Sequence, residues 1–154
     1  SKKIVKGNYK NISFTFGFTS EDNIDGIYAD LNSVSWNVPG MLGGGYHFMQ
    51  LDGKFLNATN NESNYNYHVI KAVDKTSPNN LKFQDTSFEV NLGEVIVSEE
   101  HPIIIKMNVS EWFKNPNLWD LNVLNTVLMP NFNVQIQMNE NGKNVFSLIP
   151  QLIP

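Results

Sequence analysis

The sequence of 154 residues contains no cysteine and no arginine. The lack of cysteine excludes disulfide bonds, thiolate nucleophiles, and zinc or iron–sulfur sites with cysteine ligands. The lack of arginine removes the planar fork that proteins use to bind phosphate or guanine in two places at once. The basic residues are all lysine, they form no cluster, and the formal net charge is −4. We therefore expect no binding to nucleic acid.

The signs of an enzyme are also missing. The chain has no G-x-S-x-G motif of a hydrolase nucleophile, and its carboxylates, such as Asp30 and Asp120, do not form facing pairs for acid–base chemistry. Residues 22–26 (DNIDG) begin like a calcium loop, but no glutamate follows near its twelfth position, so they predict a polar turn. Nor does any apolar run approach the ~20 residues of a membrane-spanning helix. We expect a protein without catalytic activity.

Strand patterns dominate what the sequence does contain. Apolar residues make up 41% and charged residues 17% of the chain, as in a globular domain, and we expect one domain over residues 1–154. Alternating or short apolar runs predict strands at 11–18, 46–55, 65–73, 88–92, 95–97, 103–109 and 145–149. The run 103–109 is the most apolar and should lie centrally in a sheet. Helices are predicted at 118–129 and 131–141, on either side of Met129–Pro130. The fold class is all-β, an immunoglobulin-like or jelly-roll-like β-sandwich with short helical insertions.

The most informative segment is residues 39–53, where Gly43–Gly45 runs directly into Tyr-His-Phe-Met. Consecutive glycines are costly to order, so they predict a sharp bend or a close approach of the backbone. A strand after them would put His47, Met49 and Leu51 on one face. Histidine and methionine suit a soft metal such as copper, so His47 and Met49 are candidate ligands. The alternative is a core methionine and a buried histidine with its hydrogen bonds satisfied.

A second histidine, His68, lies on the predicted strand 65–73. If strands 46–55 and 65–73 form a hairpin, the most natural register gives paired residue numbers that sum to about 118–120. His47 would then lie opposite Lys71 or Val73, and the two imidazoles would be offset by roughly 10–17 Å along the ribbon. A bulge or a glycine bend could close that gap and bring His47 and His68 to one metal ion, but the sequence does not show that one does.

Other side chains are weaker candidates. His101 lies between two glutamates and a proline, which is typical of a solvated turn before a strand. Tyr65, Tyr67 and Trp36 would suit a carbohydrate-binding face, although only their aromatic character supports that interpretation.

Several segments, taken in order, resemble the MbnP-like family, which comprises the methanobactin-cassette and copper-repressible surface proteins and their bacteroidete relatives. The specific matches are the glycine–Tyr–His block and the closing NG–VF block, and the resemblance covers about residues 9–149. The matching segments are 9–17 (YKNISFTFG), 43–55 (GGGYHFMQLDGKF), 67–68 (YH), 103–113 (IIIKMNVSEWF), 129–131 (MPN) and 141–148 (NGKNVFSL).

The resemblance implies an extracytoplasmic, copper-binding β-sandwich, periplasmic or on the cell surface and lipid-anchored to the outer membrane in bacteroidetes. It also implies that the chain lacks N-terminal strands of a longer protein. His47 and His68 match the histidine-bearing segments of the family, and Met49 matches a further family position. Some members carry beside the copper a tryptophan that a diheme peroxidase-like partner oxidises to kynurenine. Many relatives have such a tryptophan where this chain has residues 41–46, which contain none, and Trp36 is the nearest substitute.

The resulting functional hypothesis is a copper-binding protein that sequesters or hands over the metal without catalysis, with His47, His68 and Met49 as metal ligands. The alternative is a metal-free accessory lipoprotein subunit of an outer-membrane receptor or transport complex.

Overall fold

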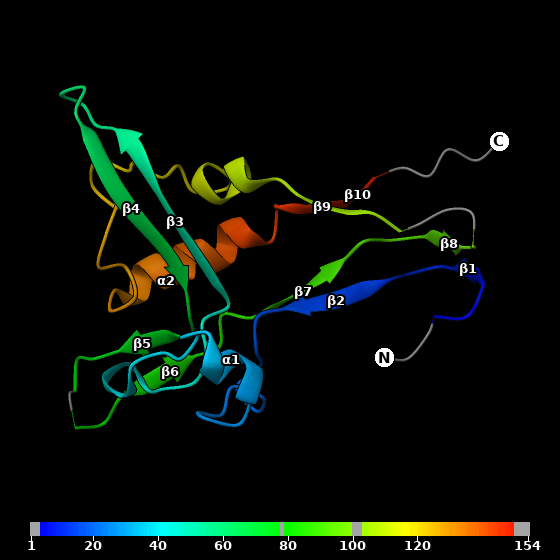
Figure 1. Ribbon diagram of the computed structural model, residues 1–154, viewed down its shortest axis with the longest axis horizontal. Coiled ribbons are helices and arrows are strands. Elements are labelled where there is room, and N and C mark those ends of the chain that lie inside the picture. The colour runs from blue at the N-terminus through cyan, green and yellow to red at the C-terminus, as the bar shows by residue number, and fades with distance from the viewer. Residues whose placement is uncertain (1–3, 78, 100–102, 150–154) are drawn as a thin grey trace.

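The computed structural model describes residues 4–77, 79–99 and 103–149 (Figure 1). The strands are β1 (Gly7–Tyr9), β2 (Ser13–Phe16), β3 (Met49–Leu56), β4 (Glu62–Val69), β5 (Ala72–Asp74), β6 (Lys82–Gln84), β7 (Phe88–Asn91), β8 (Val95–Val97), β9 (Ile105–Met107) and β10 (Phe146–Leu148). The helices are α1 (Ala29–Ser33) and α2 (Phe132–Gly142), with short 3-10 helices at Gly40–Leu42 and Val109–Phe113. Across these ranges no helix is long and apolar enough to cross a membrane.

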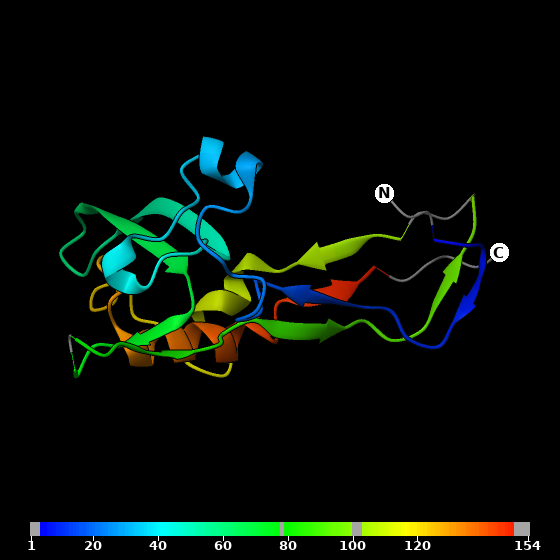
Figure 2. The same cartoon turned by 90° about the horizontal axis from the view of Figure 1, so that it is seen from below.

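The strands form small antiparallel sheets of two strands each: β1–β8, β2–β7, β3–β4, β5–β6 and β9–β10. The ribbons β2–β7 and β9–β10 lie one above the other as two layers in Figure 1 and overlap when seen from below in Figure 2. Aromatic rings fill the space between these layers, since the Phe146 ring lies 5.2 Å from that of Phe14 and 5.4 Å from that of Phe16. The all-β sandwich expected from the sequence is confirmed.

The main core lies where the β3–β4 hairpin packs against α2 and the 3-10 helix at Val109–Phe113 (Figure 1). Trp112, Tyr67 and Met138 are fully buried there. The Tyr67 hydroxyl donates a hydrogen bond of 2.9 Å to the carbonyl oxygen of Trp112, which satisfies its polar end inside the core. Tyr67 therefore cannot line an exposed carbohydrate-binding face, and that interpretation is wrong.

One predicted helix forms and the other does not. The helix expected at 131–141 is α2, and the Asn131 side chain caps it by accepting a hydrogen bond from the backbone N–H of Val134. The helix expected at 118–129 is wrong, because those residues form a series of turns. The Asp120 side chain accepts from the Asn122 backbone N–H, and the Trp119 indole donates to the Leu124 carbonyl, so side chains satisfy backbone groups that a helix would have paired.

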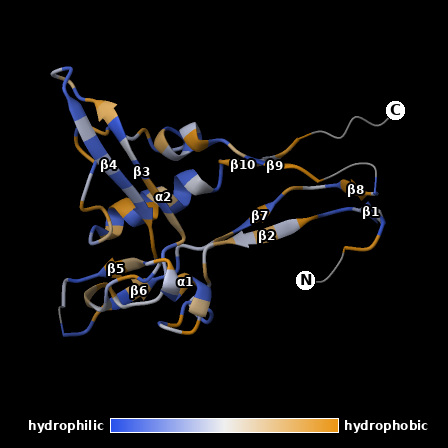
Figure 3. Cartoon of the chain, viewed as in Figure 1, coloured by the Kyte–Doolittle hydropathy of each residue, from blue (hydrophilic) through white to orange (hydrophobic). Residues whose placement is uncertain are grey.

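The apolar run 103–109 is not central. Its strand β9 pairs with β10 and leaves Ile105 44% and Met107 40% exposed. An apolar run predicts a buried strand only when other elements cover both of its faces, and all three residues of β9 are exposed. Hydrophobic colour also marks β8, at the end of the molecule away from α2 (Figure 3).

Candidate metal centre

His47 lies just outside the β3–β4 hairpin, which begins at Met49. The residues before it turn away to pair with another segment: Tyr46 forms an antiparallel bridge with Asn37, and the backbone N–H of His47 donates to the carbonyl oxygen of Trp36 over 3.0 Å. Phe48 then returns to the hairpin by donating to the Val69 carbonyl over 2.7 Å. His47 therefore spans the end of the hairpin and does not extend one of its strands.

The three glycines before this segment make the turn possible. Gly43, Gly44 and Gly45 have φ values of 87°, 61° and 83°, in the left-handed region that favours glycine. A Cβ on Gly45 would collide with the side chain of Asn23, whose Oδ1 accepts the backbone N–H of Tyr46 over 2.7 Å. The predicted bend and close approach are both confirmed.

The hairpin register agrees with the sequence, but the predicted separation of the imidazoles does not. Gln50 pairs with His68 and Met49 with Val69, which gives the expected sum of 118. The rings of His47 and His68 are nevertheless only 5.3 Å apart between centroids and almost perpendicular, at 88°. The predicted offset of 10–17 Å is wrong. It assumed that the hairpin pairing continues to His47, whereas the pairing begins at Met49. The glycine bend brings the two histidines together.

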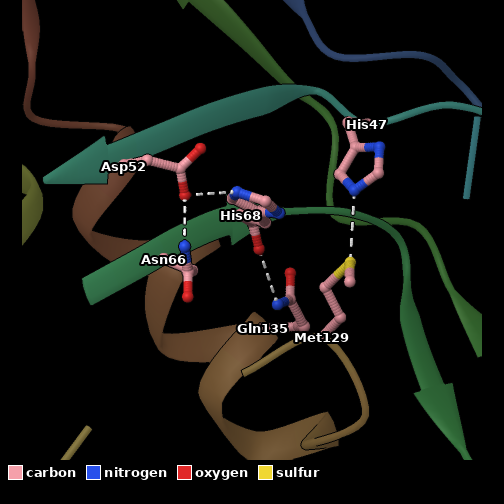
Figure 4. Close-up of polar contacts among 6 residues, drawn as sticks. All are labelled: His47, Asp52, Asn66, His68, Met129 and Gln135. Carbon is pink, nitrogen blue, oxygen red and sulfur yellow. Dashed lines mark hydrogen bonds and ion pairs between the residues drawn. The ribbon is translucent and has the colours of Figure 1, made fainter. Parts of the chain in front are cut away.

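Hydrogen bonds fix the tautomer of each ring (Figure 4). Nδ1 of His47 lies 2.9 Å from the carbonyl oxygen of Trp36, and because a carbonyl only accepts, Nδ1 carries the proton and Nε2 carries a lone pair. Nε2 of His68 lies 2.8 Å from Oδ1 of Asp52, so the proton of that ring is on Nε2 and the lone pair is on Nδ1. Figure 4 shows this second nitrogen of His68 on the side of the ring toward His47. In its uncharged form, each imidazole thus offers one electron pair to the same region.

The surroundings of His47 favour its uncharged form at neutral pH. His47 is 4% exposed, and its burial lowers the pKa of the imidazole below the ordinary 6.5, although the bond to the Trp36 carbonyl opposes the shift. The hydrogen bond from Asn66, with a further one from His68, lowers the pKa of Asp52. An ionised Asp52 beside a neutral, buried His47 is therefore the expected arrangement.

The methionine near the pair is Met129, not Met49. Sδ of Met129 lies 3.2 Å from Nε2 of His47 (Figure 4). Met49 packs against the hydrophobic core, and alternation along β3 puts it on the opposite face from Asp52. The structure therefore does not bring Met49 to the histidines. Nothing in the local pattern marked Met129, which is 82 positions from His47, although it belongs to the segment 129–131 already matched to the family.

The side chains near His47 and His68 suit some metal ions better than others. The described residues contain no group of three or more His, Cys, Asp or Glu side chains arranged around one point. Two imidazoles lie beside a thioether, and such ligands suit copper better than oxygen-seeking ions such as calcium or magnesium. Trp36 borders the site, with its ring 6.3 Å from that of His47 and its indole N–H donating to the His47 carbonyl. His101 lies outside the described residues.

Comparison with known proteins gives a family match. The model of the family described as MbnP matches residues 1–132. No curated protein and no solved structure matches the chain significantly.

Proposed function

The chain belongs to the MbnP family, and we propose that it is an extracytoplasmic copper-binding protein that sequesters or hands over the metal without catalysis. His47 and His68 supply the ligand nitrogens. We place the protein in the periplasm or on the cell surface, attached to the outer membrane by a lipid.

The observation that carries this proposal is the pairing of two imidazoles that each direct a nitrogen without a hydrogen-bonded oxygen toward a common region. The ring centroids are 5.3 Å apart, and each ring donates its only N–H to a fixed oxygen of the protein, the Trp36 carbonyl or the Asp52 carboxylate. Metal-binding histidines commonly donate their other nitrogen in this way, which orients the ring and raises the basicity of the ligand atom.

Copper stoichiometry tests the proposal. The protein purified from its native host, with and without one added equivalent of copper, should contain close to one copper per chain by elemental analysis. His47→Ala and His68→Ala should each abolish that binding and leave the circular dichroism spectrum unchanged. Gln50→Ala is the matched control, because Gln50 pairs directly with His68 on the hairpin and has no ligand role. Full copper binding in both histidine variants would overturn the proposal.

Trp36 is the residue that we propose as the target of an oxidising partner of the diheme peroxidase type. Its ring is 6.3 Å from His47 and therefore borders the copper site. Peptide mass spectrometry of the natively produced protein should find kynurenine at position 36, and Trp112 and Trp119 serve as internal controls because both are buried in the core. Unmodified tryptophan at all three positions would contradict this part of the proposal.

The alternative, a metal-free accessory lipoprotein subunit of an outer-membrane complex, is supported by a different observation. The ribbons away from the histidines expose apolar side chains, and a groove of about 210 Å³ runs between them. Its lining residues are Leu92, Glu94, Val95, Ile103, Ile104, Leu148 and Ile149. Copurification with a membrane complex, together with no copper in either of the two samples above, would favour this function.

A further inference from the structure

We propose that the thioether of Met129 is a third ligand of the histidine site. This inference rests on the proposed copper function and adds to it one ligand residue.

The first argument is the contact between Met129 and His47. Nε2 of His47 and Sδ of Met129 are 3.2 Å apart, yet the proton of the His47 ring is on Nδ1, where it donates to the Trp36 carbonyl. Two electron-pair donors therefore face one another with no hydrogen between them. A cation accepting both pairs turns this unfavourable approach into a favourable one, and a soft monovalent ion suits a thioether and an imidazole together.

The second argument is the distance itself. Nitrogen and sulfur ligands bind a small metal ion at about 2.1 Å and 2.3 Å, so at 100–120° from each other they lie roughly 3.4–3.8 Å apart. The observed 3.2 Å differs by only a few tenths of an ångström. The two atoms thus lie near the separation that one shared ion requires.

The third argument is that buried hydrogen bonds position Met129. The fully buried Gln135 side chain donates to the carbonyls of His68, over 3.0 Å, and Leu128, over 3.3 Å, and it accepts from the backbone N–H of Ile70 over 2.9 Å. One side chain therefore joins the residue before Met129 to the strand that carries His68 (Figure 4). Asn66 adds a backbone bond of 2.7 Å to the carbonyl of Asn125. The loop that ends in Met129 is fixed to β4.

A methyl NMR titration tests whether Met129 is a ligand. Silver(I), a diamagnetic substitute for copper(I), is added to protein carrying ¹³C-labelled methionine methyl groups, and the Met129 signal is assigned through Met129→Leu. That signal should shift strongly up to one equivalent of silver, whereas the signals of Met41, which is 72% exposed, and Met138, which is buried in the core, should move little.

Affinity measurements test how much the Met129 thioether contributes to metal binding. Competition with a copper(I) chelator should show that Met129→Leu weakens copper(I) binding roughly tenfold or more. Removal of a residue that only supports a metal ligand already lowers metal affinity about 10- to 100-fold, so loss of a ligand should cost at least the lower of these values. Zinc(II) binding should be unchanged in the same variant, because zinc sites in proteins use nitrogen, thiolate and carboxylate ligands. Met49→Leu is the matched control and should leave the copper(I) affinity unchanged.

The outcomes separate the two proposals. If His47→Ala abolishes copper(I) binding while Met129→Leu leaves the affinity unchanged and the Met129 methyl signal does not respond to silver, the third ligand is disproved and the histidine site stands. If the wild-type protein binds neither silver nor copper, both proposals fail.

Discussion

Oδ1 of Asp52 accepts two hydrogen bonds, one from Nε2 of His68 over 2.8 Å and one from the side-chain amide of Asn66 over 2.6 Å. Asp52 and Asn66 are direct cross-strand partners on the β3–β4 hairpin, and His68 lies two residues farther along the same face. The hairpin therefore holds the carboxylate, the amide that orients it and the histidine in one row. Because the carboxylate takes the N–H of His68, the other nitrogen of that ring remains free to bind a metal.

We predict that Asp52→Ala weakens copper binding about 10- to 100-fold without abolishing it, the usual loss when a residue that supports a metal ligand is removed. The physical reason is that His68 loses the partner that fixes its tautomer and orientation. Competition titration measures the effect. Asp74→Ala is the matched control, since Asp74 is a carboxylate on another hairpin, β5–β6. Equal affinities of the Asp52→Ala variant and the wild type would show that Asp52 does not support the site.

The metal-free protein should lose stability in mild acid because of His47. Burial lowers the pKa of His47 in the folded protein below the ordinary 6.5 of the unfolded chain. As the pH falls through 6.5 the unfolded state takes up a proton before the folded state does, so the contribution is fully present above that pH and declines below it. Urea unfolding with a chelator present, between about pH 7.5 and 5, should show a smaller decrease in His47→Gln than in the wild type. The same decrease in both proteins would contradict the prediction. Asp52, whose pKa is lowered, stays ionised over this range.

Gly45→Ala should destabilise the fold by about 1–3 kcal/mol, the usual cost of a side chain in an unfavourable backbone conformation, and more where the Asn23 side chain cannot move aside. Gly45 has a φ of 83°, and its Cβ would meet Asn23. Gly40→Ala is the matched control, because a Cβ there meets nothing within 4 Å. The free energy of unfolding in urea measures both changes. Equal stability of the two variants would show that the glycine bend tolerates a side chain.

A second readout connects this bend to the site. Displacement of residues 45–47 in Gly45→Ala should also weaken copper binding, since the same turn brings His47 to within 5.3 Å of His68. Gly40→Ala should bind copper as the wild type does.

Local patterns predicted the fold class, the hairpin register that pairs Gln50 with His68, the helix that follows Asn131, and the bend at the three glycines. These features depend on alternation, on capping and on backbone conformations that only glycine adopts readily, all of which are properties of short segments. The apolar pattern wrongly predicted that β9 is buried, because burial depends on whether another part of the protein covers the strand. It also failed for residues 118–129, where side chains of the turn compete with helical hydrogen bonds.

The sequence by itself determined the two histidines as candidates, because their residue type and the glycine block beside one of them are local features. Only the tertiary structure decided that their rings meet, that Asp52 and the Trp36 carbonyl set their tautomers, and that Met129 and not Met49 accompanies them. The physical reason is that a strand fixes the face on which a side chain lies but not its distance from a residue beyond the strand. That distance depends on how the chain turns after the glycines and on how Gln135 fixes a loop 82 residues away from His47.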